Sequence, residues 1–233
     1  MKTVFTVLLM ISLSVGTLAQ QKATSFSNAI ELHLPKYIES CQNAVMYQEY
    51  DMLNVLFDSL VKTHLQGTTV DPHKITRLDG GTINMDSLHR PMLLSTTTSW
   101  YLKNDEEIEA LNTLASEFKG KIDVVILYWD SKKLVKQASK DFNEDVIVVY
   151  VDESSNRDNN IIKSYKHALG VPASFYISSE QKIVDISRGG LVKFSPEPEK
   201  ELYASNYELF QRHIMRLLLS DELSKDTILS DTD

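Results

Sequence analysis

The sequence predicts an α/β protein in which helices cover a mixed β-sheet, preceded by a helical extension. From residue 90 onward, short apolar runs alternate with amphipathic segments, the pattern of strands followed by helices. The runs at residues 124–129 and 146–151 are almost continuously apolar, as expected for strands that are covered on both faces. Residues 27–65 contain no glycine and repeat apolar side chains at helical spacing.

The first 19 residues have the composition of a secretory signal peptide. Met1 and Lys2 give a positive start, residues 4–15 are almost entirely apolar, and Thr17 and Ala19 are small. We expect cleavage between Ala19 and Gln20, which predicts a periplasmic or secreted protein. The apolar stretch is too short for a good membrane span, although an uncleaved anchor remains the alternative.

Residues 20–68 are predicted to form the N-terminal helical extension. Leu53, Leu56 and Leu60 recur at three- and four-residue steps, and Gly67 ends the segment. Pro35 is expected to interrupt the helix and divide the segment into two or three helices. Such an extension either covers one side of the main domain or forms a homodimer.

Residues 69–220 carry the strand and helix pattern of the main domain. A Gly80–Gly81 turn between two short runs predicts a β-hairpin. Further strands are expected at residues 92–98, 124–129, 146–151, 173–177 and 182–187, and helices at 104–118, 131–142, 160–169 and 195–219. The polar, acidic residues 221–233 are expected to be a flexible tail.

Charge and cysteine content exclude several classes of function. The formal net charge of −8 argues against binding to nucleic acid and to anionic membranes. Cys41 is the only cysteine, so the chain can form no internal disulfide. A small buried core residue and a redox-active thiol are the two interpretations of Cys41.

Four segments, in order, resemble the redoxin branch of the thioredoxin fold, which includes the periplasmic TlpA- and ResA-like thiol–disulfide oxidoreductases. They are ITRLDGGTINMDSLHRPMLLSTTTSW, NDEEIEALNTLASEF, GVPASFYIS and KIVDISRGG, which start at residues 75, 104, 170 and 182. The second contains Glu107, Leu111 and Asn112 at the spacing usual for the first helix of that family. The resemblance implies a thioredoxin-like three-layer sandwich with a mixed central sheet.

The chain departs from the family at the catalytic motif. Where the family has Trp-Cys-x-x-Cys, this sequence has Trp100 followed by Tyr101, Leu102, Lys103 and Asn104. Disulfide exchange needs a thiolate, which neither a phenol nor an amide supplies. We therefore predict no catalytic residue at this position. Asn104 and Glu107 instead have the spacing of a helix capping box.

The resemblance also implies a peptide-binding cleft that does not depend on the cysteines. The cleft would be formed by Trp100, Tyr101, Val171, Pro172 and Gly189, with a cis bond between Val171 and Pro172. In the family, the backbone beside that proline pairs with an extended substrate strand. The alternative for Trp100 is simple packing at the end of the sheet.

No metal or cofactor site is predicted. None of the six histidines has zinc-ligand spacing, and residues 152–160 lack the glycine and distal glutamate of a calcium loop. Glycine loops that bind phosphate are also absent. The leading hypothesis is therefore a redox-inactive binding or assembly module for an unidentified envelope protein or peptide. The alternative is an oxidoreductase that acts through Cys41 or through the thiols of a partner.

Overall fold

The central sheet has seven strands in the order β2-β1-β5-β4-β3-β6-β7. The computed structural model describes residues 24–101, 105–156, 159–188 and 199–230. The strands are β1 (Lys74–Arg77), β2 (Thr82–Asn84), β3 (Met92–Thr97), β4 (Asp123–Tyr128), β5 (Val146–Tyr150), β6 (Ala173–Ile177) and β7 (Ile183–Arg188). The pairs β3–β4 and β4–β5 are parallel and the other neighbours are antiparallel, so the predicted mixed sheet is confirmed.

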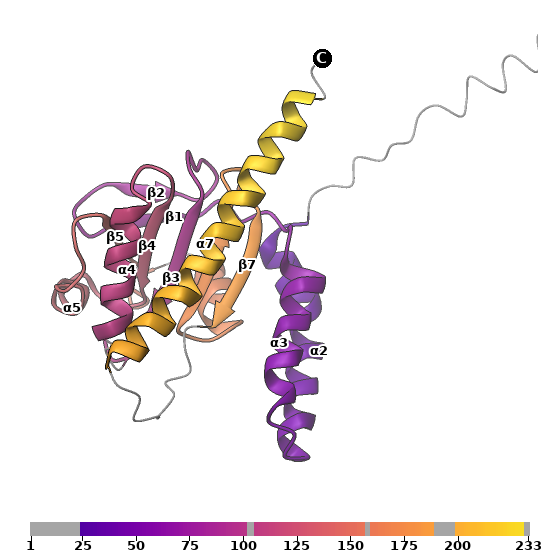
Figure 1. The fold of residues 1–233 in the computed structure, drawn as a ribbon. Coiled ribbons are helices and arrows are strands. Elements are labelled where there is room, and N and C mark those ends of the chain that lie inside the picture. The colour runs from indigo at the N-terminus through magenta and orange to yellow at the C-terminus, as the bar shows by residue number, and fades with distance from the viewer. Residues whose placement is uncertain (1–23, 102–104, 157–158, 189–198, 231–233) are drawn as a thin grey trace, which may run out of the picture.

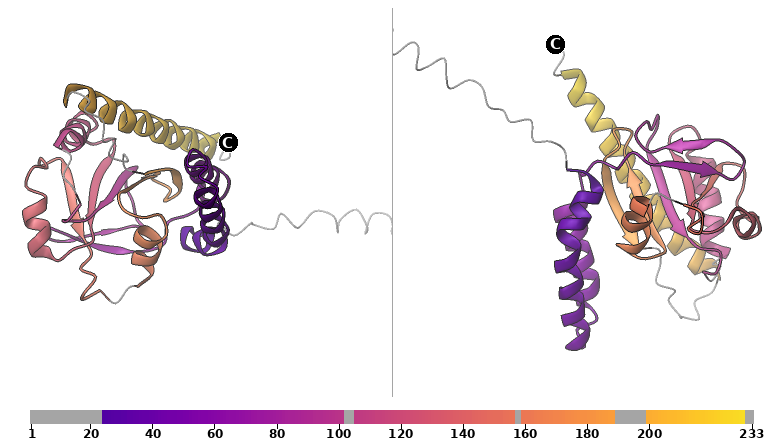
Figure 2. Two further views of the ribbon diagram at one scale, coloured as in Figure 1. Left: turned by 90° about the horizontal axis from the view of Figure 1, so that it is seen from below. Right: turned by 180° about the vertical axis from the view of Figure 1, so that it is seen from behind.

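Alternation along β4 shows how the two faces of the sheet are filled. Val124 and Ile126 face one core, while Val125 and Leu127 face the other, as the two-residue period of a strand requires. Helices α4 (Asp105–Glu117), α5 (Lys132–Ala138) and α7 (Glu199–Ser230) contribute to the first core. The second core receives α6 (Asn159–Ile162) and the following π-helical turn η2 (Lys163–His167). The result is a three-layer sandwich (Figures 1 and 2).

The predicted hairpin joins β1 to β2 through Gly80 and Gly81. Both glycines have positive φ, 110° and 81°, a conformation that strongly favours glycine. Ile75 pairs with Ile83 across the hairpin, and Thr76 pairs with Tyr150 of β5. The hairpin is therefore added to the sheet at the edge opposite β7.

The extension forms a helical hairpin of α2 (Phe26–Met46) and α3 (Met52–Leu60), which continues into the π-helical turn η1 (Val61–Leu65). The expectation that Pro35 interrupts the helix is wrong, because α2 continues through it. Pro35 is exposed, so water can satisfy the backbone carbonyl that lacks its partner. The chain instead turns after Met46, where Gln48 has a φ of 59°.

The extension covers one side of the main domain, as one of the two sequence-based alternatives proposed. Gln66 donates a hydrogen bond to the Val184 carbonyl (2.9 Å), and the Gly67 amide donates to the Ile183 carbonyl (2.7 Å). These bonds occupy part of the outer edge of β7, which protects that edge from pairing with other chains. Figure 1 shows α2 and α3 standing beside β7 and extending beyond the end of the strand.

Helix α7 is longer than the sequence pattern indicated. The prediction of a flexible tail that starts at Asp221 is wrong for residues 221–230, because α7 continues to Ser230. Asp221 is only 2% exposed, and its Oδ1 accepts hydrogen bonds from the Ser179 amide and hydroxyl at 2.8 and 2.6 Å. This buried carboxylate fixes the helix beyond the predicted end. Among the described residues, no helix is both long and apolar enough to cross a bilayer.

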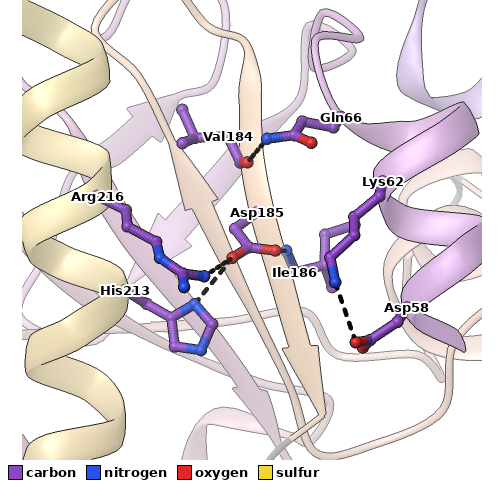
Figure 3. A network of polar contacts seen from close by, with 8 residues as sticks. All are labelled: Asp58, Lys62, Gln66, Val184, Asp185, Ile186, His213 and Arg216. Atoms are coloured by element: carbon purple, nitrogen blue, oxygen red, sulfur yellow. Dashed lines mark hydrogen bonds and ion pairs between the residues drawn. The ribbon is translucent and has the colours of Figure 1, made fainter. Parts of the chain in front are cut away.

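Asp185 of β7 anchors α7 to the sheet (Figure 3). Its Oδ2 lies 2.9 Å from His213 Nδ1 and 3.6 Å from Arg216 Nη1, and its Oδ1 accepts from the Ile186 amide (2.9 Å). Burial opposes ionisation, but the hydrogen bonds and the charges of His213 and Arg216 hold the pKa of Asp185 below its usual range. The ionised carboxylate is therefore stabilised in the folded protein.

We expect Asp185→Asn to lower the free energy of unfolding at pH 7 by about 1–3 kcal/mol, because it removes the charge from a partly buried network. The pKa is depressed in the folded state. The contribution is therefore complete above the unfolded value of about 3.9 and is lost as the pH falls below it. Urea unfolding at pH 7 and pH 3 measures this difference.

Asp58→Asn is the matched control. The Asp58–Lys62 ion pair (3.2 Å) is also drawn in Figure 3, but both of its side chains are more than 60% exposed. Exposed pairs contribute little, so we expect a change below about 0.5 kcal/mol. Equal effects of the two substitutions would show that Asp185 does not anchor α7.

Candidate functional site

The residues at the position where the resemblance would place the cysteine motif follow strand β3. The Ser99 amide donates to Asp130 Oδ2 (2.6 Å), and the Tyr101 amide donates to the Thr98 carbonyl (3.2 Å). These bonds hold the loop at the carboxyl ends of β3 and β4. Leu102, Lys103 and Asn104 of the degenerate motif, and with them the predicted capping box, lie outside the described residues.

Pro172 lies across from this loop at the start of β6. The Val171–Pro172 bond is cis, as the resemblance implied. Ala173 pairs with Thr96 of β3, where the Thr96 hydroxyl accepts from the Ala173 amide (3.2 Å) and donates to its carbonyl (3.1 Å). Pro172 is thereby held at the same end of the sheet as Tyr101.

A cavity of about 330 Å³ lies between α4, α5 and the ends of β3 and β4. Tyr101 and Pro172 both line it, so the structure brings together two of the five residues of the predicted cleft. Its other polar lining residues are Ser95, Thr97, Thr98, Ser99, Glu107, Tyr128 and Gln137, and the apolar ones are Ile108, Leu111, Ile126, Leu134, Ala138 and Phe142. Its size falls at the lower end of the range for small-molecule sites.

The remaining residues of the predicted cleft have different positions. Trp100 does not line the cavity and is 75% exposed, so the alternative that it packs at the end of the sheet is wrong. Val171 is half-buried and packs against the second core. Gly189 lies outside the described residues. An exposed indole next to Tyr101 is a feature typical of binding surfaces.

Glu107 was not predicted to belong to the cavity. Burial raises the pKa of its carboxyl from 4.5 to about 7. Burial, and then the charge of Glu107, raise the pKa of Tyr101 above its ordinary value. The signal in the sequence is the spacing, because Glu107 lies four and seven residues before the buried Leu111 and Leu114 on the inner face of α4.

The cavity has groups that can bind a ligand and exchange a proton with it, but its lining contains no thiol. Thr98 Oγ1 is buried and has no hydrogen-bond partner among the described residues. Buried polar atoms normally have partners, so this hydroxyl is available to a ligand. A carboxyl that titrates near neutrality, like that of Glu107, can accept or donate a proton at physiological pH.

Cys41 lies elsewhere in the molecule. It is half-buried on α2, interacts with the Tyr37 hydroxyl and lines a separate groove against the end of β7. This thiol therefore lines a different groove from the cavity at Tyr101. The interpretation of Cys41 as a small buried core residue is wrong, because the side chain is only half-buried and belongs to neither core.

Metal ligands do not gather among the described residues, where no group of three histidine, cysteine or acidic side chains could hold an ion. The structure does bring together two histidines that the sequence spacing left apart. The rings of His33 and His64 are stacked with centroids 3.7 Å apart, and burial followed by the charge of His64 lowers the pKa of His33.

Comparison with known proteins gives a structural match. No family model matches the chain, and no curated protein matches it. A solved structure from Chlorobium tepidum, assigned as a thiol:disulfide interchange protein DsbE, is 16% identical and has a TM-score of 0.50. The match covers 66% of this chain and 97% of that one. This chain has a thioredoxin fold.

Other solved structures with the same fold match less closely. The thioredoxin domain of a thiol-disulfide oxidoreductase from Bacteroides vulgatus is 16% identical with a TM-score of 0.45, covering 63% of this chain and 99% of that one. StoA from Bacillus subtilis is 16% identical with a TM-score of 0.41, covering 57% and 95%. The predicted fold class is confirmed, including the helical extension that precedes the domain.

Proposed function

We propose that this protein is an exported thioredoxin-fold module that binds an extended peptide or protein segment and does not exchange disulfides. The observation that carries the proposal is that Tyr101 and cis-Pro172 line the same cavity. Disulfide exchange requires a thiolate nucleophile, and Tyr101 offers a phenol at this position. The exposed Trp100 beside Tyr101 supplies an aromatic contact surface. Loss of the thiols removes the reaction and leaves the surface.

Export is the part of the proposal that rests on the first 19 residues. Their charged start, apolar middle and small residues before Gln20 are typical of a cleaved signal peptide. We expect the mature protein in the native host to begin near Gln20 and to lie in the periplasm or outside the cell. N-terminal sequencing of the purified native protein measures this. An intact Met1 on a cytoplasmic pool would contradict export.

Inactivity in disulfide exchange has a direct test. Reduction of insulin disulfides by the protein with dithiothreitol is expected to match the buffer blank, because neither Tyr101 nor the rest of the cavity lining supplies a thiolate. Cys41→Ser should leave that result unchanged. The alternative function, an oxidoreductase that uses Cys41, is favoured by the position of this thiol in an open groove. Insulin reduction that alkylation of Cys41 abolishes would establish that alternative.

Binding is tested by capture of proteins from an envelope extract of the native host. The double substitution Trp100→Ala with Tyr101→Ala is expected to reduce capture of the partner by about tenfold or more, because aromatic side chains dominate binding energies. The melting temperature should change little, since Trp100 is 75% exposed. Leu219→Ala, which changes a 62%-exposed residue on α7, is the control. Equal capture by all three proteins would contradict the binding surface.

A further inference from the structure

A second groove lies between the helical extension and the main domain. Tyr37, Ile38, Val45 and Met46 of α2 form one side, and His167 and Arg188 form the other. It encloses about 650 Å³. Arg188 is the last residue of β7 and pairs with Ala173, the residue after Pro172. The groove therefore begins close to the proposed cleft, but it shares no lining residue with the cavity at Tyr101.

Arg188 is held in this groove by aromatic side chains, and no carboxylate of the described residues pairs with it. Its guanidinium lies over the Phe57 ring at 4.3 Å and over the Tyr37 ring at 5.7 Å, and it donates a hydrogen bond to the Tyr37 hydroxyl. Its Nε is buried and has no hydrogen-bond partner among the described residues. Stacking on aromatic rings fixes the plane of the guanidinium, and the donors other than the one bonded to Tyr37 can recognise an anion.

The charge of the groove defines what it binds. The protein has a net charge of −8, yet none of the described residues that line the groove is acidic. Among these described lining residues Arg188 is the one permanent charge, and most of the other side chains are apolar. A buried guanidinium donor without a partner is unfavourable unless a ligand supplies the acceptor. A carboxylate is the group that matches a guanidinium in both charge and shape.

We propose that this groove binds a protein segment in which a single carboxylate is flanked by apolar side chains. The carboxylate pairs with Arg188, and the apolar side chains cover Ile38, Val45 and Met46. These three residues are 43%, 48% and 64% exposed, so the wall that they form is open and needs a broad partner surface to bury it. The binding of this segment does not depend on the cleft at Trp100.

The surrounding charges favour one carboxylate over several. Between Lys36 and Lys62 the extension contains four acidic residues and no further basic residue, and Asp58 is the one of the four that pairs with Lys62. A polyacidic segment would be repelled by them, and so would a second copy that brought the same acidic helices against this one. A segment with one carboxylate meets Arg188 and otherwise makes apolar contacts.

Selection from a phage library of random twelve-residue peptides on the purified protein tests this proposal. The enriched peptides are expected to share one Asp or Glu between apolar residues. Arg188→Gln and Met46→Glu should each lower the affinity of the protein for these peptides by about tenfold or more. Arg188→Gln removes the charge-assisted hydrogen bond, and Met46→Glu introduces a charge that repels the peptide carboxylate. Met46 is exposed, so its substitution tests the groove even if Arg188→Gln loosens the extension.

Two substitutions on α7 serve as matched controls. Arg216→Gln and Met215→Glu change residues that are not among those lining the groove, with 60% of the Arg216 side chain and 54% of Met215 exposed. They should alter the affinity less than twofold. Trp100→Ala distinguishes the two proposals, since peptides that are sensitive only to this change bind in the cleft, which supports the proposed function and overturns the present inference.

Other outcomes would also overturn the inference. They are a library that yields no enriched peptide, enriched peptides without a carboxylate, and peptides indifferent to both Arg188→Gln and Met46→Glu. Displacement of the peptides by laurate would assign the groove to a lipid carboxylate. A dimer on size-exclusion chromatography that Met46→Glu dissociates would assign it to a second copy of the chain.

Discussion

Phe26→Ala is expected to lower the free energy of unfolding by about 3–5 kcal/mol, the usual range for removing a large aromatic side chain from a core. Phe26 is the first residue of α2, and its side chain is 0% exposed. Its ring centroid lies 5.1 Å from that of Tyr165 and 5.8 Å from that of Phe175. The first residue of α2 is therefore inserted into the core of the main domain.

Urea unfolding followed by circular dichroism measures this loss. Leu32→Ala is the control, because Leu32 lies on the same helix and is 72% exposed, so its change should stay within about 0.5 kcal/mol. If Phe26→Ala were as mild as Leu32→Ala, the extension would not belong to the cooperative core. A single transition in the wild type is expected, since the extension and the sheet share one apolar cluster.

Most strands and helices of the main domain could be predicted because their signals are local. The apolar run at β4 identifies a strand covered on both faces, and the Gly80–Gly81 pair identifies a hairpin. The packing of α2 against the main domain was harder to predict. Helical periodicity shows that one face of a helix is buried, but it does not show which element covers that face. Phe26 carries no sequence signal that connects it with Tyr165 or Phe175.

The errors have a common physical cause, which is that tertiary contacts overcame local preferences. Pro35 does not interrupt the helix because its neighbours Leu34 and Tyr37 pack against the second core, and because Pro35 is exposed where water can satisfy the unpaired carbonyl. The acidic end of α7 continues as a helix because Asp221 is buried against Ser179. Both outcomes depend on residues far apart in the sequence.

The candidate site was predicted only in part for the same reason. The order of segments placed Tyr101 near Pro172, since a known family supplied the arrangement. The polarity of Glu107 indicated a helix start, although its spacing from Leu111 also placed it on the inner face of α4. Arg188 gave no signal at all, because its aromatic partners come from the extension.

Glu107 is expected to make the protein less stable as the pH rises. Burial raises its pKa from 4.5 in the unfolded chain to about 7 in the folded protein. Between these values the folded protein binds more protons than the unfolded chain, so the free energy of unfolding falls with increasing pH. By linkage, at about 1.4 kcal/mol per pKa unit, the loss amounts to about 3–4 kcal/mol and is complete above pH 7.

Glu107→Gln replaces the carboxyl with a neutral group of similar shape and should remove this penalty. We expect the variant to be more stable than the wild type by about 3–4 kcal/mol at pH 8 and nearly equal to it at pH 4.5. Comparing the two proteins at each pH cancels the contributions of all other titrating groups. Glu106→Gln, one residue earlier on α4, is the control and should shift the free energy of unfolding by less than about 0.5 kcal/mol at either pH. A Glu107→Gln variant that gains no stability at pH 8 would mean that the carboxylate is well solvated or paired at the cavity, and that Glu107 does not titrate near neutrality.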